Sequence, residues 1–269
     1  MKIKDWLKGT QTQLTDAKVE SARLDSLLIL SMVLGKPKEW ILANTDELIP
    51  RSKGRELDAL VNQRAKHFPM AYMLGYREFY GHEFIVNQDV LIPRPETEEL
   101  VDYIIKNAPQ NAAILDVGTG SGCIAVSIKL ARPDIEVTAT DISKKALKVA
   151  KLNAKALKTV INFVHSDLFS KFDILDSKFS IITANLPYVP TDSSHATNAE
   201  IDFEPKEALF SGYDGLDHYR KFFEQANNFL SPNGFIIIEH DPEQYSRLET
   251  IGQTTKVTRF VTKLKLKTN

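Results

Sequence analysis

The stretch Ala113-Ile-Leu-Asp-Val-Gly-Thr-Gly-Ser-Gly-Cys123 decides the fold class of this chain. It opens with a short apolar run that predicts a buried strand. Glycines then stand at alternate positions, Gly118, Gly120 and Gly122, where a backbone can turn sharply and let a ligand approach closely. The dinucleotide fingerprint is excluded, because Cys123 stands where that pattern has its third glycine. We therefore expect a strand–turn–helix unit for a nucleotide-like ligand without a pyrophosphate.

Strands and helices alternate around this unit. Strands are predicted over 113–117, 136–141, 161–164, 180–184 and 235–239. Helices are predicted from residue 96 or 97 onward and over 123–131, 143–157 and 216–230. Alternation at this spacing favours a parallel sheet covered by helices on both faces. The last part, 256–262 and 263–267, is expected to add two antiparallel strands.

The first 75 residues or so have a different pattern of apolar residues, which predicts a small helical bundle. Apolar residues recur near a 3.6-residue period over 16–34, until Gly35 and Pro37 stop the pattern. Another helix is expected from Ser52, and Gly75 closes a short turn over 69–74. Aromatic and β-branched runs on either side of Gly81-His82 then predict a β-hairpin. We expect a helical domain over 1–76, a hairpin linker over 77–92 and a second domain over 93–269.

Composition narrows the class of protein. Forty-three percent apolar and 26% charged residues are typical of a soluble globular chain, and the net charge of -1 gives no global basic field for stable nucleic-acid binding. The start lacks a signal-peptide core, and no apolar run reaches the length of a membrane span. We expect a cytoplasmic protein that works as a monomer, without membrane contact.

Metal and thiol chemistry are not favoured. Cys123 is the single cysteine, so an intramolecular disulfide and a multi-cysteine metal site are excluded, and we expect it to be a small buried residue. Five histidines lack the spacing of metal ligands, so no metal is expected: His82, His165, His195, His218 and His240. The six lysines between Lys144 and Lys158 follow helical spacing, and we interpret them as a solvated face rather than a nucleic-acid surface.

The ligand that fits the glycine turn is S-adenosylmethionine, which carries an ammonium and a sulfonium but no pyrophosphate. Asp116 suits the ammonium, and the exposed amides of the loop suit the carboxylate. Asp141 ends the next strand and can accept both ribose hydroxyls, while Asp167 and Leu168 follow the third strand and would flank the adenine. Ligands of α/β sheets bind at such strand ends. The expected contacts are Asp116, Gly118, Thr119, Gly120, Ser121, Gly122, Asp141, Asp167, Leu168 and Asn185.

The turn Asn185-Leu186-Pro187-Tyr188 after the fourth strand suits a planar nitrogen acceptor. An amide nitrogen is a poor nucleophile, so the available route is to position and polarise it with hydrogen-bond acceptors. The Asn185 side chain and the backbone carbonyl of Leu186 would hold the NH2 group, and Tyr188 offers a flat surface. Pro187 forces the preceding residue into an extended conformation, which fixes the direction of its carbonyl. These residues are the expected catalytic group.

Nearly the whole chain resembles the HemK/PrmC N5-glutamine methyltransferases, which modify the Gly-Gly-Gln glutamine of class I peptide release factors. The matching segments are Pro69-Met-Ala-Tyr-Met-Leu-Gly75, Phe79-Tyr-Gly-His-Glu-Phe84, Val90-Leu-Ile-Pro-Arg-Pro-Glu-Thr-Glu98, Leu115-Asp-Val-Gly-Thr-Gly-Ser-Gly122, Phe203-Glu-Pro205 with Ala208-Leu209, and Asp214-Gly-Leu216 with Tyr219-Arg220. The resemblance implies a helical domain that docks the release factor, followed by a class I methyltransferase domain. This domain is an α/β, Rossmann-like, seven-stranded sheet with an antiparallel C-terminal hairpin. It also implies cofactor contacts along 118–122 and at Asp141, Leu168 and Asn185, glutamine contacts along 185–188, and S-adenosylhomocysteine as product.

Two features depart from the family pattern. The family's turn is usually Asn-Pro-Pro-Tyr, whereas Leu186 gives a turn similar to that of ribosomal-RNA adenine dimethyltransferases. After the last parallel strand the family tends to continue with Gly and Gln, whereas this chain has His240-Asp-Pro-Glu-Gln244 and a short lysine-rich end. The alternatives are a ribosomal-protein glutamine methyltransferase, an adenine-N6 methyltransferase of RNA or DNA, or a silent binding module. Asp116, Asp141 and Asn185 argue against the last.

Overall fold

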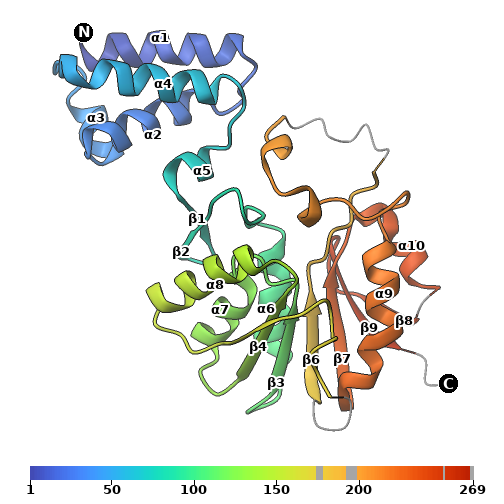
Figure 1. The fold of residues 1–269 in the computed structure, drawn as a ribbon. Helices are drawn as coiled ribbons and strands as arrows, with labels where there is room; N and C mark the ends of the chain where they lie inside the picture. Colours follow the sequence, from blue (N-terminus) through green and yellow to red (C-terminus); the bar gives the residue numbers. More distant parts are fainter. Residues whose placement is uncertain (174–177, 192–198, 251, 267–269) are drawn as a thin grey trace. The chain divides into compact units, whose positions relative to one another are not determined.

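The computed structural model describes residues 1–173, 178–191, 199–250 and 252–266, and these fall into two compact units (Figure 1). The first unit comprises Met1–Gly75 and, among the described residues, 199–203. The second begins at Tyr76 and comprises the rest. None of the described helices combines the length and the apolar character that a membrane span requires.

The first unit is the helical bundle that the sequence predicts. Its helices are α1 (Ile3–Asp16), α2 (Ala22–Leu34), α3 (Lys38–Ala43), α4 (Gly54–Arg64) and α5 (Met70–Leu74), with 3-10 turns η1 (Arg51–Lys53) and η2 (Ile201–Phe203). Apolar side chains from α1, α2 and α4, among them Trp6, Ile29 and Leu57, meet in one core. One polar pair is buried in the unit: Asp25 of α2 and Arg64 of α4 are each 2% exposed.

The predicted helix over 16–34 is wrong at its start, because a turn separates α1 from α2. Lys18 adopts a left-handed conformation with φ +62°, which ends α1. The amide of Val19 donates to the carbonyl of Leu14 at 2.9 Å, and its side chain is buried. The apolar residue that extended the periodic pattern therefore anchors a turn, and the second helix begins only at Ala22.

The second unit opens with the predicted β-hairpin, β1 (Tyr76–Phe79) and β2 (His82–Ile85). Tyr80 and Gly81 connect the strands with φ +51° and +73°, the positive values that a tight two-residue hairpin turn requires. Phe79 and Phe84 are buried and pack edge to face, with 5.9 Å between ring centroids. The hairpin thereby joins the core of this unit.

The rest of the second unit is a seven-stranded sheet with its helices (Figure 1). The strands are β3 (Ala113–Val117), β4 (Glu136–Asp141), β5 (Asn162–His165), β6 (Phe179–Ala184), β7 (Leu230–Glu239), β8 (Gly252–Lys256) and β9 (Val261–Leu266). The helices are α6 (Thr97–Asn107), α7 (Cys123–Ala131), α8 (Lys144–Ala156), α9 (Asp217–Ala226) and α10 (Tyr245–Leu248), with 3-10 turns η3 (Lys206–Ala208), η4 (Asn227–Phe229) and η5 (Pro242–Gln244).

The strand order is β5-β4-β3-β6-β7-β9-β8, so the order reverses between β3 and β6. The five strands from β5 to β7 are parallel, while β9 pairs antiparallel with both β7 and β8. The predicted Rossmann-like sheet with an antiparallel C-terminal hairpin is confirmed. A reversal point between parallel strands is where open α/β sheets bind their ligands, outside the carboxyl ends of the strands.

Alternating residues of each strand supply two cores on opposite faces of the sheet. Ile114 of β3 packs with α6 and α7 in one core, and its neighbour Leu115 packs with α9 in the other. Two boundaries differ from the predicted ones. The helix predicted over 216–230 ends at Ala226, because Leu230 already pairs with Phe179 in the sheet. The last two strands turn at 257–260 rather than between 262 and 263, since Lys256 pairs with Thr262.

Candidate active site

The predicted site residues gather at the carboxyl edge of the sheet, on both sides of the reversal point. Val117 of β3 pairs with Ala184 of β6, so the glycine loop and the turn at Asn185 leave neighbouring strands. Asp141 is the last residue of β4, the strand on the other side of β3. The fold thus brings together residues that lie far apart in the sequence.

Asp116 is fully buried at the end of β3, and its charge has no protein cation to balance it. One carboxylate oxygen, Oδ2, accepts a hydrogen bond from Thr119 Oγ1 at 2.6 Å, while Oδ1 has no partner among the described residues. The pKa of Asp116 is raised to about 7, chiefly by burial and also by the nearby Asp141, while the Thr119 hydrogen bond and the backbone of Ala125 oppose the shift. A buried hydrogen-bond acceptor without a partner lowers the stability of the folded protein, so it indicates that a hydrogen-bond donor of a ligand binds there.

The glycine loop is held by backbone hydrogen bonds and has no room for a side chain at Gly118 or Gly122. Gly118 and Thr119 both donate to the carbonyl of Thr140, at 2.9 and 2.8 Å. Gly118 has φ +75°, and a Cβ there would meet Leu186 Cδ2 at 2.9 Å; Gly122 has φ +81° and would meet Ala150 Cβ at 3.0 Å. Glycine is therefore required at both ends of the loop.

Asp141 holds the loop from the side of β4. Its Oδ2 accepts from the Gly120 amide and its Oδ1 from the Ser143 amide, both at 2.8 Å. Burial raises the pKa of Asp141, and these hydrogen bonds oppose the shift. Each carboxylate oxygen keeps a further lone pair for a ligand hydroxyl.

The two residues expected beside the adenine lie beyond β5, whose last residue is His165. Asp167 is exposed, and Leu168 is half-buried with φ +46°. The turn is tied by Ser166 Oγ, which donates to the Leu168 carbonyl at 2.9 Å. Leu168 also packs at the margin of the core that contains α9.

Asn185 stands directly after β6 and is half-buried. Its Nδ2 donates to Thr97 Oγ1, the first residue of α6, at 3.2 Å. Its Oδ1 accepts no hydrogen bond from a described residue. This orientation leaves the side-chain carbonyl free to accept from an amine.

Leu186 is fixed at both its backbone and its side chain. Its amide donates to the hydroxyl of Tyr219 at 3.2 Å, and that hydroxyl donates in turn to the backbone carbonyl of Glu239. The Leu186 side chain is 5% exposed and packs in the core beside Gly118. Tyr219 is fully buried, so this bridge between the ends of β6 and β7 is shielded from water.

Pro187 and Tyr188, the other half of the turn, are both half-buried. The Tyr188 carbonyl accepts from Gln244 Nε2 at 2.9 Å, and its hydroxyl donates to Glu239 Oε1 at 3.3 Å. Burial raises the pKa of Tyr188, and Glu239 raises it further. The side chain of Gln244, within the segment that departs from the family pattern, thus holds the acceptor turn.

Sequence reasoning missed four residues that hold this turn: Thr97, Tyr219, Glu239 and Gln244. Thr97 and Tyr219 stood only in segments that match the family, and Glu239 and Gln244 had no predicted role. A signal existed for Glu239, since it ends a buried strand like Asp141 does. Thr97, Tyr219 and Gln244 had no such signal, because their contacts depend on the packing of α6, α9 and η5.

The site fits S-adenosylmethionine by the chemistry of its groups. A buried carboxylate oxygen without a partner suits the ammonium, and a loop of positive-φ glycines lets a ligand approach the backbone. An anionic ligand would not fit beside Asp116, because the residues that the structure describes in this unit include no buried lysine or arginine. The residues present therefore match a cationic cofactor.

The remaining predictions concern metal and surface. Cys123 is buried as expected, and burial raises its pKa to about 12. Groups of His, Cys, Asp and Glu that could hold a metal are absent from the described residues. His195 lies outside the described residues. All six lysines from Lys144 to Lys158 are exposed.

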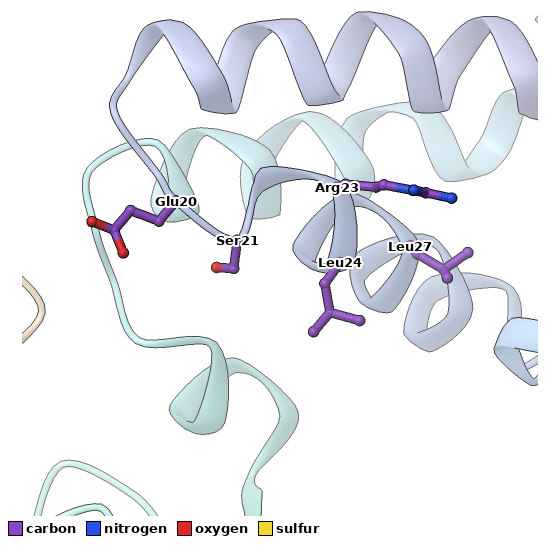
Figure 2. Close-up of a pocket in the computed structure, with 5 residues that line it drawn as sticks. All are labelled: Glu20, Ser21, Arg23, Leu24 and Leu27. Carbon is purple, nitrogen blue, oxygen red and sulfur yellow. The ribbon is translucent and has the colours of Figure 1, made fainter.

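A pocket lies on the helical unit at the start of α2 (Figure 2). It is lined by Glu20, Ser21, Arg23, Leu24 and Leu27. Leu24 is half exposed, and none of the predicted site residues lines this pocket.

Comparisons with known proteins agree with this arrangement. Residues 5–75 match the family model of the PrmC N-terminal domain, and residues 95–212 match that of the methyltransferase small domain. A release factor glutamine methyltransferase of Geobacter sulfurreducens is 36% identical over 88% of this chain and 82% of its own length. One of Coxiella burnetii is 37% identical over 94% of this chain and 91% of its own length. The chain belongs to the release factor glutamine methyltransferases.

Two further comparisons concern length and fold. A bifunctional methyltransferase of Rickettsia felis is 36% identical over 88% of this chain, which spans only 51% of that relative. Among solved structures, the fold is similar to that of a 16S rRNA N2 methyltransferase of T. thermophilus, which was solved in complex with AdoMet and guanosine. The TM-score is 0.53 and the sequence identity is 17%, and the match covers 71% of this chain and 50% of the T. thermophilus chain. This likeness shows the fold alone.

Proposed function

We propose that this chain transfers the methyl group of S-adenosylmethionine to the side-chain amide nitrogen (N5) of the glutamine in the Gly-Gly-Gln motif of class I peptide release factors. The product of the cofactor is S-adenosylhomocysteine. One observation carries the proposal: Asp116 and Asn185 lie at the carboxyl ends of the neighbouring strands β3 and β6, at the reversal point. Asp116 is buried without a buried cation beside it among the described residues, and the side-chain carbonyl of Asn185 accepts no hydrogen bond from them. One suits a cationic methyl donor, and the other suits an amide acceptor.

When bound, the cofactor supplies an electrophilic methyl group on a sulfonium. Asp116 Oδ1 would accept from the ammonium, and the loop amides would donate to the carboxylate. Asp141 would accept from the ribose hydroxyls while it keeps the Gly120 amide in place. Asp167 would accept from the adenine amine, and Leu168 would pack on the adenine face.

The acceptor side works by orientation rather than by proton abstraction. Asn185 Oδ1 and the carbonyl of residue 186 would each accept from the glutamine NH2 group, so the nitrogen is aimed and negative potential is concentrated where positive charge develops. Tyr188 would support the planar amide with its ring. The glutamine nitrogen would form a bond to the methyl carbon while the S–C bond breaks and its electron pair stays on sulfur, and the nitrogen would then lose one proton to solvent.

The turn is rigid enough for this task. Thr97, Tyr219 and Gln244 fix Asn185, Leu186 and Tyr188 through hydrogen bonds at 3.2, 3.2 and 2.9 Å. Catalytic groups on a turn need such support, because small misplacements reduce the rate strongly. The structure supplies this support from α6, α9 and η5.

We assign release-factor docking to the helical unit over 1–75. Its match to the PrmC N-terminal domain supports this role. We further propose that the protein works in the cytoplasm, as a monomer, without stable nucleic-acid binding. The net charge of -1 supports the last point.

The decisive experiment labels a release factor with tritiated S-adenosylmethionine, with and without its Gly-Gly-Gln glutamine replaced. We expect labelling of the parent factor and none of the replaced one. Equal labelling of both would contradict the proposal. A ribosomal protein labelled better than the release factor would instead favour the ribosomal alternative.

The adenine-N6 alternative depends on Leu186 opening space for a purine. The Leu186 side chain is instead 5% exposed and belongs to the core, which favours a role for its backbone carbonyl. A nucleic-acid substrate would also show binding that falls steeply with salt. We expect weak binding that is absent at physiological salt.

A further inference from the structure

The carboxylate of Glu239 lies against the acceptor turn, yet the proposed reaction has no role for it. Glu239 ends β7 and is 1% exposed. Oε1 accepts from the Tyr188 hydroxyl at 3.3 Å, whereas Oε2 is buried without a hydrogen bond of ordinary geometry to any described residue. Ala184 pairs with Ile238, so Asn185 and Glu239 follow paired positions on adjacent strands.

The groups in contact with this carboxylate carry no positive charge. Of the charges that act on the neighbouring Tyr188, Arg94 lowers its pKa and is paired with Glu204, and Asp241 raises it. The pKa of Glu239 is raised to about 7, chiefly by burial and also by the neighbouring charge of Glu96, which stands before α6. Its charge also raises the pKa values of Cys123 on α7, Tyr219 on α9 and Tyr188 in the turn. Polar contacts with Thr97, Tyr188 and Asn185 oppose the shift. A carboxylate kept in such surroundings costs stability, so a purely structural role would be served better by an apolar side chain.

The contact with Tyr188 completes the support of the acceptor turn. Gln244 holds the backbone of Tyr188, and Glu239 is the group that holds its hydroxyl at the far end of the ring. An ionised carboxylate can accept the hydrogen bond from the Tyr188 hydroxyl at either of its oxygens, whereas a protonated one is a weaker acceptor and carries a competing O–H donor. The orientation of the ring therefore follows the ionisation of Glu239.

We propose that Glu239 is a positioning residue of the methyl transfer, whose ionised carboxylate sets the orientation of Tyr188 and, with Thr97, of Asn185. This inference rests on the proposed function, because the amide of the substrate is what the turn would orient. Glu239 acts through these neighbours and has no contact with the reacting atoms in the account given above.

The first test measures release-factor methylation by Glu239→Gln, Glu239→Asp and the exposed control Glu243→Gln. Glu239→Gln keeps the shape and loses the charge, so kcat should fall by about 10- to 100-fold, the range of a lost hydrogen bond to a charged group. The KM for S-adenosylmethionine should stay within about threefold. Glu239→Asp should recover part of kcat, and Glu243→Gln should match the parent. A kcat in Glu239→Gln equal to that of the parent overturns the proposal.

The second test follows kcat against pH at saturating cofactor and substrate, which reports groups in the complex. The parent should gain activity as pH rises through about 7, where Glu239 ionises. Glu239→Gln should lose this rise and show a flat profile over the same range. A rise that persists unchanged in Glu239→Gln would assign it to another group and overturn the proposal.

A third measurement needs no activity. With 13C-labelled glutamate carboxyls, one signal should titrate near pH 7 and disappear in Glu239→Gln. Tyr188→Phe should raise its midpoint, because the lost hydrogen bond favours the ionised form. If the midpoint is unchanged, the Tyr188 contact is absent and the inference fails even in an active enzyme. If the midpoint moves but no release factor is methylated, the contact stands, while the proposed function and the role in catalysis fail.

Discussion

Each unit of this protein buries carboxylates, and the two units treat them differently. In the helical unit, Asp25 receives a hydrogen-bonded ion pair from Arg64 Nε at 2.6 Å, and both side chains are almost fully buried. Arg64 also binds Glu200 at 2.6 Å and the carbonyl of Phe68. In the sheet unit, Asp116 and Glu239 are as deeply buried, but each has an oxygen without a partner among the described residues, none of which is a buried lysine or arginine in this unit.

The difference separates a structural charge from a functional one. A buried acid that is paired in the free protein adds to the specificity of the fold, whereas one that stays unpaired lowers stability until a ligand supplies the missing charge or donor. The unpaired acids lie at the carboxyl ends of β3 and β7, on both sides of β6 and its acceptor turn. The contrast therefore points to the same edge of the sheet as the predicted site residues, without reference to any relative.

The largest effect should come from breaking the paired acid. Arg64→Met leaves Asp25 buried without its cation, and the free energy of unfolding should fall by about 3–5 kcal/mol. Urea unfolding measures this, with the exposed Arg55→Met as a matched control that should change little. The affinity for S-adenosylmethionine should not change at a temperature where the variant is folded. If Arg64→Met is as stable as the parent, Asp25 does not depend on its ion pair, and the proposed difference between the paired and the unpaired acids is wrong.

The next effect concerns the acceptor turn. Asn185→Ala removes the open carbonyl and should lower kcat by on the order of 10²–10³-fold, the scale of one lost preorganised electrostatic group. Steady-state methylation of a release factor checks this, with thermal unfolding to show that the fold is kept. If kcat is unchanged, the role assigned to the turn is wrong.

A smaller effect should follow from the unpaired Asp116. Its pKa of about 7 lies above the ordinary value of 3.8, so the free folded protein holds a proton that the unfolded chain has lost. Stability from this group is therefore greatest below pH 4 and falls as pH rises towards 7. A cationic ligand favours the ionised form, so S-adenosylmethionine should bind about tenfold more tightly at pH 8 than at pH 6. Asp116→Asn should lose this dependence and bind more weakly at pH 8.

The smallest effect should come from Leu186→Pro, which restores the family's usual turn. Proline removes the amide that donates to Tyr219 and the side chain that packs near Gly118, but it keeps the carbonyl of residue 186. One lost hydrogen bond is worth about 1 kcal/mol, so kcat should stay within about tenfold of the parent. Leu186→Ala, which keeps the amide, separates the two losses. Release-factor activity that appears only in the proline variant would favour the adenine alternative.

Much of this contrast could be predicted, and the rest depended on tertiary packing. Asp116 and Asp141 lie at the ends of strands with clear patterns and Asn185 directly follows one, so the rule that ligands bind at strand ends was enough to predict that they meet at one edge of the sheet. The ion pair of Asp25 and Arg64 joins two helices across 39 residues of sequence, and no local pattern reports it. Val19 misled the helix prediction because a buried turn residue continued the helical period. Tyr219 and Gln244 reach the turn only through the packing of α9 and η5.

We propose that the ammonium of the cofactor supplies the positive charge that the buried Asp116 carboxylate lacks in the free protein. Proton release on binding tests this most directly. Calorimetric titration of S-adenosylmethionine at pH 7, in two buffers of different ionisation enthalpy, counts the protons exchanged. The account predicts net release by the parent, because binding ionises a half-protonated acid, and a smaller release by Asp116→Asn. Binding by the parent without proton release, or with uptake, would contradict it.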